Sequence, residues 1–299
     1  MTFDYYCAST VRMQSTMRSY LVTGCSRGIG LELTRQLANS EDDALIFASA
    51  RSRNNLKFQE LLGQHQERIV YVPLDVTDQV SIKNAVDTVT SKLDGRGLDV
   101  LINNAGVMSN GPIEEMYASS PYPVPLAFRD RLALVYLAHL SAVLTQSALR
   151  DDLEDAFRTN VLGVHNLTRA VLPLMRKGTE KKILNISTTL GSISKQLVNH
   201  HVATPSYKIT KAALNMLTVV YANELEKEGF TVFCVSPGWL KTDLGSENAD
   251  LPVDVGVTSV RDILHRTGKD GNGRFFNIHV PGWENAPGMN QYDGKEVPW

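Results

Sequence analysis

Cysteine is scarce in this chain. Three cysteines, Cys7, Cys25 and Cys234, are spread over 299 residues, and their spacing fits neither a metal site nor a disulfide framework. This scarcity excludes the disulfide-rich class of secreted domains and favours a reducing compartment, so we expect a cytoplasmic protein. The polar, mixed start of the chain also lacks the apolar core of a secretory signal peptide. We expect residues 1–18 to form a disordered N-terminal extension, with a transit peptide as the alternative.

A charge excess of one sign is absent as well. The chain has 30 Lys and Arg residues against 32 Asp and Glu residues, which gives a formal net charge of −2. Such a balance argues against a polyanionic partner, so we expect no nucleic-acid partner. Hydrophobic residues make up 43% of the sequence, which is enough to build one large core.

Short β-rich apolar runs alternate with helical patterns along most of the chain. Ile29, Leu33 and Leu37 repeat at helical spacing, and a longer series from Leu153 to Met175 does the same. Continuous apolar strands between helices are typical of a parallel sheet that is covered on both faces. We therefore predict an α/β fold, a doubly wound parallel sheet (Rossmann fold), in a single domain over 19–299. The runs predicted as strands are Tyr20–Thr23, Ala44–Ala50, Ile69–Leu74, Val100–Asn103, Ile183–Ser187, Thr231–Val235 and Arg274–Ile278.

The segment 107–152 does not fit this alternation. It contains Pro121, Pro123 and Pro125, and an uncharged run, Leu132–Leu149, that has the length of a membrane span. The run also carries polar side chains, and a span here would split the sheet, so we expect no membrane insertion. We expect an atypical insert that forms an extra helix near the site. The alternative is translated non-coding sequence from a mistaken gene prediction.

A glycine-rich turn joins the first predicted strand to the first predicted helix. A strand, a glycine turn and a helix in succession are the context that a dinucleotide-binding motif requires. Gly24 permits the sharp exit from the strand, while Gly28 and Gly30 let the backbone approach a pyrophosphate and let the helix pack on the sheet. The phosphates would meet free N–H groups at the helix N-terminus. The residues of this turn that we assign to cofactor binding are Gly24, Ser26, Arg27, Gly28, Ile29 and Gly30.

An arginine, rather than an acidic residue, follows the second predicted strand. An acidic residue about 20 positions after the glycines would bind the ribose 2′-hydroxyl of NAD(H), and residues 44–52 contain none. Arg51 is placed to pair with a 2′-phosphate, and Arg27 can reach the same phosphate, because a guanidinium matches phosphate geometry. We therefore predict NADP(H) as the cofactor. Asp75 and Val76, after the third predicted strand, are also assigned to cofactor binding. The Asp75 carboxylate would accept a hydrogen bond from the adenine amino group, and its alternative role is the N-cap of a helix.

Tyr207 and Lys211 lie four residues apart and so share one face of a helix. At about 4 Å and an effective dielectric near 20, a lysine charge attracts a phenolate by roughly 4 kcal/mol, or about 3 pKa units. We therefore expect Lys211 to lower the pKa of Tyr207 until the phenol serves as an acid or base near neutrality. The spacing alone is common on solvated helices, but downstream of a nucleotide-binding turn it indicates a catalytic pair.

With these residues the chain resembles the short-chain dehydrogenase/reductase family over residues 19–299, outside the segment 107–152. The run Tyr292–Trp299 and the residues 237–243 resemble the sniffer-like and C-factor-like carbonyl reductase branch, and fungal ketoreductases of secondary metabolism. The motifs that carry the family resemblance are the 23–30 turn, Asp75-Val76, Asn103-Asn104-Ala105-Gly106, Asn160 within Thr159–Gly163, Tyr207 with Lys211, and Pro237-Gly238.

The resemblance implies a role for each motif. Tyr207 would protonate the carbonyl oxygen during reduction, while Lys211 would lower its pKa and hold the nicotinamide ribose. Asn160 would anchor a water that links the lysine to solvent. Asn104, Ala105 and Gly106 would line the adenosine and ribose end of the cleft. Pro237, Leu240 and Thr242 would pack against the nicotinamide and bind its carboxamide, and Gly238 is also assigned to cofactor binding.

One departure from the family pattern concerns the hydroxyl that holds the substrate carbonyl, which the family supplies as a serine. Aligned on Gly191, this position falls on Thr188, and Ser187 is its neighbour. Consecutive strand side chains face opposite ways, so a regular strand points only one of the two at the substrate. We favour Thr188 and keep Ser187 as the alternative. The long gap before Tyr207 is expected to loop over the pocket around Asn199–His201, with both histidines exposed and no metal bound.

Together these residues predict an NADP(H)-dependent oxidoreductase that reduces an aldehyde or ketone to an alcohol. Its partners would be a small carbonyl substrate and, in a homodimer or homotetramer, further copies of the chain. Two alternatives stay open. One is a non-catalytic NADPH-binding regulator, and the other is a dehydratase or epimerase that uses the same site.

Overall fold

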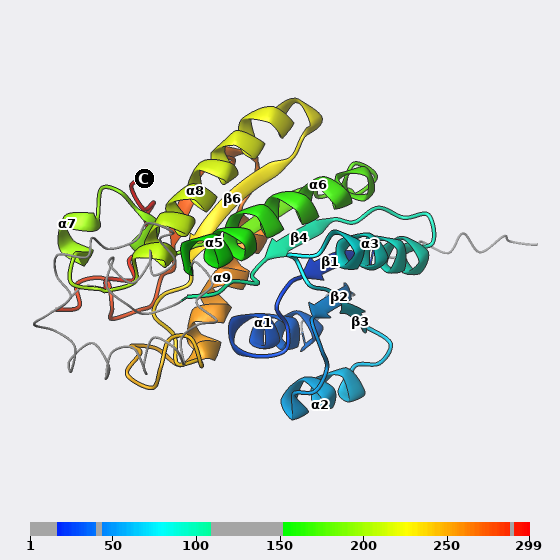
Figure 1. The fold of residues 1–299 in the computed structure, drawn as a ribbon, viewed down its shortest axis with the longest axis horizontal. Coiled ribbons are helices and arrows are strands. Elements are labelled where there is room, and N and C mark those ends of the chain that lie inside the picture. Colours follow the sequence, from blue (N-terminus) through cyan, green and yellow to red (C-terminus); the bar gives the residue numbers. More distant parts are fainter. Residues whose placement is uncertain (1–16, 40–43, 109–151, 288–289) are drawn as a thin grey trace, which may run out of the picture.

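Seven parallel strands form one sheet, in the order β3-β2-β1-β4-β5-β6-β7 (Figure 1). The structure is a computed structural model, and it describes residues 17–39, 44–108, 152–287 and 290–299. The predicted doubly wound parallel sheet is confirmed, and all seven predicted strands are present within a residue or two of their expected ends. The strands are β1 (Arg18–Val22), β2 (Ala44–Ala50), β3 (Ile69–Pro73), β4 (Val100–Asn103), β5 (Lys182–Ile186), β6 (Thr231–Ser236) and β7 (Phe275–Asn277).

Helices cover both faces of the sheet (Figure 1). On one face α1 (Gly28–Asn39), α2 (Leu56–Gln64) and α9 (Val253–Arg266) pack on the strands. On the other face lie α3 (Gln79–Leu93), α6 (Val164–Met175) and α8 (Pro205–Leu225). The shorter elements are α5 (Asp152–Phe157), the π-helix η3 (Arg158–Gly163), α7 (Gln196–Asn199) and the 3-10 turns η4 (Thr189–Gly191), η5 (Glu226–Glu228) and η6 (Lys269–Gly271).

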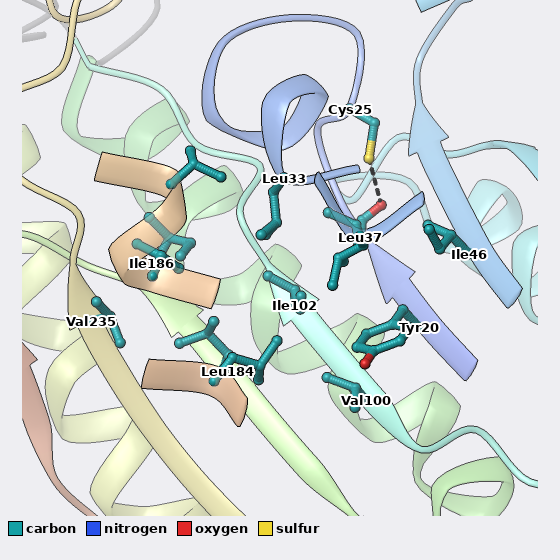
Figure 2. Packing of buried hydrophobic residues seen from close by; sticks show 14 of the residues in the cluster. Tyr20, Cys25, Leu33, Leu37, Ile46, Val100, Ile102, Leu184, Ile186 and Val235 are labelled. Carbon is teal, nitrogen blue, oxygen red and sulfur yellow. Dashed lines mark hydrogen bonds between the residues drawn. The ribbon is translucent and has the colours of Figure 1, made fainter. Parts of the chain in front are cut away.

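Alternating strand side chains supply the two cores. In β4, Val100 and Ile102 join the core under α1, whereas Leu101 faces the core under α3 and α6. Figure 2 shows the first core, where Leu33 and Leu37 from α1 lie against the strand side chains. Because every strand is apolar on both faces, the period-2 alternation between polar and apolar residues is lost, as the sequence indicates.

The two atypical segments themselves lie mostly outside the described residues. Residues 1–16 of the expected N-terminal extension and residues 109–151 of the expected insert belong to the part of the chain that the structure does not describe. At the edges of these segments, Arg18 opens β1 and Asp152 begins α5. Both residues therefore belong to regular elements, although we had assigned them to the extension and the insert. No helix among the described residues is long and apolar enough to cross a membrane.

A buried carboxylate ties the amino end of β1 to the turn before β5. Asp99 is 7% exposed, and one of its oxygens accepts hydrogen bonds from the Ser19 backbone N–H and hydroxyl, each at 2.9 Å. The other oxygen accepts from the Thr179 backbone N–H at 2.8 Å and from its hydroxyl at 2.9 Å. Burial alone would raise the pKa of Asp99, but these four bonds hold it below its ordinary value.

Replacing Asp99 by alanine should lower the free energy of unfolding by about 3 kcal/mol or more, because four hydrogen bonds to a charged group are lost and the buried Ser19 N–H loses its acceptor. A carboxylate with a lowered folded pKa stabilises fully above its unfolded pKa of about 3.9, and this contribution is lost as pH falls through the folded value. The difference in the free energy of unfolding between wild type and Asp99→Ala, measured with urea, should therefore be smaller at about pH 3 than at about pH 7. Asp87→Ala, at an exposed ion pair with Lys83, is the control and should change little. Equal effects of both substitutions would contradict the assignment.

Candidate active site

A cavity of about 1460 Å³ opens at the carboxyl ends of the strands. Parallel α/β sheets bind ligands at this edge, next to the point where the strand order reverses, which here lies between β1 and β4. Most of the residues predicted for the site line this cavity: Gly24, Ser26, Arg27, Gly28, Ile29, Arg51, Asp75, Val76, Asn104, Ala105, Gly106, Ser187, Thr188, Tyr207, Lys211, Pro237, Gly238, Leu240 and Thr242. The structure thus brings together side chains that are up to about two hundred positions apart in the sequence.

The glycine turn forms one wall of the cavity, and it leaves little room for a side chain at Gly24 and at Gly30. Gly24 and Gly28 have φ angles of +73° and +57°, which other residues rarely adopt. A Cβ on Gly24 would lie 3.0 Å from the Ala105 Cα, so the turn passes directly against the end of β4. A Cβ on Gly30 would overlap the carbonyl oxygen of Gly24. Gly30 therefore lies behind the cavity wall, where it lets α1 pack on the turn, and not on the wall itself.

Thr23 joins the turn to the end of β4, a role that the sequence motifs did not reveal. Its hydroxyl oxygen accepts hydrogen bonds from the backbone N–H groups of Asn104 and Ala105, both at 2.9 Å. In return the Asn104 side-chain amide donates to the Thr23 carbonyl at 2.7 Å. These bonds hold the two strand ends together where the strand order reverses. The sequence signal for this role of Thr23 is a polar residue at the end of an apolar strand.

Two arginines lie at the mouth of the cavity. Arg51 is exposed just beyond β2, and its charge contributes to the electrostatic environment of Asp75. Burial alone would raise the pKa of Asp75, but hydrogen bonds from Thr77 and the Arg51 charge hold it below the ordinary value. Arg27 instead forms an exposed ion pair, with its Nη1 3.1 Å from Asp243 Oδ2. The Asp243 carboxylate therefore competes with a phosphate for the Arg27 guanidinium, and no local sequence pattern indicates this pairing.

Asp75 does not cap a helix. Its Oδ1 accepts from the Thr77 N–H at 2.9 Å and from the Thr77 hydroxyl at 2.7 Å, and these bonds hold the loop after β3. The N-cap of α3 is Asp78, whose carboxylate accepts from the N–H groups of Val80 and Ser81. The alternative interpretation of Asp75 as an N-cap is therefore wrong. The adenine contact stays a prediction.

Tyr207 and Lys211 lie one turn apart on α8, with the Lys211 Nζ 5.6 Å from the centre of the Tyr207 ring. The Nζ donates a hydrogen bond of 2.7 Å to the carbonyl oxygen of Ile186, at the end of β5. Burial raises the pKa of Tyr207 to about 12 and lowers that of Lys211 to about 8. The net shift of the Tyr207 pKa among the protein's own residues is therefore upward, with burial as its cause, and not downward as the sequence predicts.

Asn160 lies in a stretch of π-helix, η3, that interrupts the predicted long helix from Leu153 to Met175. Its side-chain amide donates to the Val107 carbonyl at 2.9 Å and to the Thr210 hydroxyl at 3.0 Å, and its oxygen accepts from the Val107 N–H at 2.9 Å. Asn160 is fully buried behind the cavity wall, so it fixes the residues after β4 against α8. Its predicted water-anchoring role stays a prediction.

The neighbours Ser187 and Thr188 face different surroundings. The Ser187 hydroxyl is buried and donates a hydrogen bond of 2.5 Å to the side-chain oxygen of Asn215. The Thr188 side chain is half-buried at the cavity, and its oxygen accepts from the Leu190 N–H at 3.2 Å. Because the Thr188 oxygen is the acceptor in that bond, its own proton can be donated to a ligand.

The segment after β6 closes one side of the cavity. Gly238 has a φ of +87°, and the Thr242 hydroxyl accepts from the Gly245 N–H at 3.0 Å. Tyr292, which the sequence motifs did not single out for the site, also lines the cavity. Its hydroxyl accepts from the Trp239 N–H at 3.1 Å and donates to Asp250 at 2.5 Å. The C-terminal run thereby holds the segment that was predicted to pack on the nicotinamide.

The long gap before Tyr207 forms a short helix rather than a plain loop. Val198 and Asn199 of α7 line the cavity, as does Val202 beyond it. The C-terminus lies beside α7 (Figure 1), and the Ser192 hydroxyl donates to the Pro298 carbonyl at 2.5 Å. The two histidines, at 200 and 201, are exposed.

Comparison with known proteins shows that the chain is similar to members of one family. The profile described as short chain dehydrogenase matches residues 18–121, and the profile described as enoyl-(acyl carrier protein) reductase matches residues 136–270. The matches extend into the segment 107–152, which the sequence interpretation had excluded from the resemblance, and they leave 122–135 between them. The short-chain dehydrogenase/reductase atnB of an Arthrinium species is 31% identical over 237 residues, 79% of each chain.

Solved structures agree. The NADPH-bound carbonyl reductase from chicken fatty liver is 30% identical, with 95% of this chain and 99% of that chain covered and a TM-score of 0.74. The carbonyl reductase Sniffer of D. melanogaster is 25% identical, with 95% and 100% covered and a TM-score of 0.69. The predicted resemblance to the sniffer-like branch is confirmed. With its sheet order, its glycine turn and these relatives, the chain belongs to the short-chain dehydrogenase/reductase family.

Proposed function

We propose that this protein is an NADP(H)-dependent reductase that converts an aldehyde or ketone to an alcohol. The observation that carries the proposal is the position of Tyr207, Lys211 and Thr188 on the wall of the same cavity as the glycine turn. A proton donor, a cation and a hydroxyl donor are the groups that carbonyl reduction needs beside a dinucleotide.

The residues at the other end of the cavity fit a phosphorylated dinucleotide. Gly24 and Gly28 leave a cradle in which a Cβ would be strained, and α1 begins at Gly28 with its N-terminus toward the cradle. Among the described residues, the Ser49 hydroxyl is buried without a hydrogen-bond partner, two positions before Arg51. We infer that Arg51 pairs with the 2′-phosphate and that Asp75 faces the adenine. The solved relative from chicken is named as NADPH-bound, which supports this choice.

The chain's own residues would act on the substrate carbonyl as follows. The chemistry that NADPH supplies when bound is a hydride for the carbonyl carbon. Thr188 donates a hydrogen bond to the carbonyl oxygen, and Tyr207 transfers its proton to that oxygen as negative charge develops there. Lys211 supplies a positive charge near the phenol, which stabilises the phenolate that Tyr207 becomes.

The test is the loss of NADPH absorbance with a panel of aldehydes and ketones, followed by identification of the alcohol formed. Consumption of NADPH with alcohol formed in equal amount supports the reductase. Tight NADPH binding without consumption across the panel would favour the regulator instead. Conversion of a substrate at constant NADPH absorbance would favour the dehydratase or epimerase.

Replacing Arg51 by aspartate should raise the Kd for NADPH about 10- to 150-fold, because a charge-assisted contact to a phosphate is worth about 1.5–3 kcal/mol. The same change should improve NADH binding, because a carboxylate can accept from a ribose hydroxyl. Fluorescence titration with both nucleotides measures this. Arg53→Asp is the matched control, since Arg53 lines a separate surface hollow with Gln59 and Leu62. Unchanged NADPH affinity in Arg51→Asp, or equal losses in both variants, would rule out the contact.

A further inference from the structure

A buried polar seam joins α8 to β5 below the cavity. From its upper end, Lys211 donates to the Ile186 carbonyl, and at its lower end the Thr218 hydroxyl accepts from the Asn185 side-chain amide at 2.9 Å. Asn215 lies between them on the same helix face, four residues after Lys211. Buried polar groups of this kind fix the position of a helix on a strand, because any displacement leaves them unpaired.

Asn215 is the member of the seam that reaches the turn carrying Thr188. Its side-chain oxygen accepts from the Ser187 hydroxyl at 2.5 Å, and its amide donates to the Gly191 carbonyl at 3.2 Å. Ser187 directly precedes Thr188, and Gly191 is the last residue of the turn η4. The side chain is 3% exposed, so water does not readily replace either bond. Asn215 thus holds both ends of the segment from Ser187 to Gly191.

The same segment lies directly on the catalytic helix. A Cβ on Gly191 would lie 2.9 Å from the backbone carbon of Lys211 and 3.1 Å from the Ala212 nitrogen. Contact this close means that a shift of the turn changes the position of Thr188 relative to Lys211 and Tyr207. Within the turn, the Gly191 N–H donates to the Thr188 carbonyl at 2.9 Å, so the turn moves as a unit.

We propose that Asn215 is a positioning residue that sets the Thr188 hydroxyl at its catalytic distance from Tyr207 and Lys211. This inference rests on the proposed reductase function. It also gives Ser187 a different task from that of its neighbour. The Ser187 hydroxyl donates its single proton to Asn215 and so holds the turn. Thr188 is then the residue whose hydroxyl contacts the substrate.

The competing view is that Asn215 contributes only to stability, as any buried polar residue does. Thr218 allows the two views to be separated, because it belongs to the same seam but contacts Asn185, inside β5, and not the turn. Thr218→Val should therefore lower stability and leave the turn in place. Asn215→Leu, of similar volume, removes both bonds to the turn. Asn215→Ala removes the same two bonds without adding a branched side chain. It takes the place of Asn215→Leu in the comparison if Asn215→Leu does not fold.

Two measurements test the proposal on the full chain. Hydrogen exchange, followed by mass spectrometry on peptides that cover 187–192, should speed up about 10-fold in the Asn215 variant and stay at the wild-type rate in Thr218→Val. The kcat with NADPH and the best carbonyl of the panel should fall about 10- to 100-fold in the Asn215 variant alone, with the Kd for NADPH within about twofold of wild type. Both variants are compared at a temperature well below their unfolding transitions.

The outcomes separate this inference from the proposed function. Unchanged exchange at 187–192, or equal acceleration in Thr218→Val, would show that Asn215 does not hold the turn. Faster exchange with a wild-type kcat would show that the turn's position does not matter to catalysis. Both results overturn the inference and leave the reductase assignment intact. A wild-type protein that consumes no NADPH would instead overturn the function, and it would also overturn the catalytic meaning given to Asn215.

Discussion

Tyr207→Phe should lower the kcat for carbonyl reduction about 10²–10⁴-fold and leave the Kd for NADPH nearly unchanged. The substitution removes the phenolic proton and keeps the ring that lines the cavity. Steady-state rates and fluorescence titration measure the two effects separately. Tyr221→Phe is a matched control on the same helix. The Tyr221 hydroxyl lies 2.9 Å from His165 Nδ1, and Tyr221 does not line the cavity. Loss of this hydroxyl should therefore leave kcat at the wild-type value. Retention of most of the turnover in Tyr207→Phe would remove Tyr207 from the mechanism.

The pKa values of the pair add a dependence on pH to this result. With a pKa raised to about 12 by burial, Tyr207 carries its proton throughout the physiological range, which is the form that reduction requires. Burial lowers the pKa of Lys211 to about 8, so its positive charge is present below that pH and is lost as pH rises through it. We therefore expect kcat for reduction to be level in mild acid and to fall above about pH 8. A rate that rises with pH through this range would show that Tyr207 acts after losing its proton.

The sequence predicted the sheet well because the physical signals for it are local. An apolar run between two helical patterns is buried on both faces, and each of the seven runs became a strand. The glycine turn was predicted for the same reason, since the positive φ angles at Gly24 and Gly28 call for glycine. The helical pattern from Leu153 to Met175 was recognised, but its interruption by η3 was not, because apolar residues three or four positions apart continue through that stretch at Phe157, Val161 and Val164.

The electrostatics of the site depend on burial and on distant partners, and these were harder to predict. The spacing of Tyr207 and Lys211 gives their proximity, but the pKa shifts follow from the protein packed around them. The pairing of Arg27 with Asp243 joins residues 216 positions apart, and no local pattern announces it. Thr23 and Asn215 were missed for a related reason, since each acts through a backbone or side-chain partner on another strand or turn.

The choice between the two neighbouring hydroxyls has the second large expected effect. Thr188→Ala should lower kcat about 10²–10³-fold, the usual cost of losing a donor to a developing oxyanion. Ser187→Ala should cost less, because the Ser187 proton is already donated to Asn215 and the Gly191 bond still holds the turn. Thr188→Ser, which keeps the hydroxyl, should restore most of the rate.

These three variants are compared by kcat and KM with one carbonyl substrate, alongside the Kd for NADPH. The Kd should be nearly the same in all of them, because both hydroxyls lie at the end of β5, away from the glycine turn. A Thr188→Ala protein with wild-type kcat and a Ser187→Ala protein without activity would reverse the assignment. The hydroxyl that now binds Asn215 would then have to turn toward the substrate, which it can do only by giving up a bond of 2.5 Å inside the seam. Such a result would mean that the seam is rearranged when substrate binds.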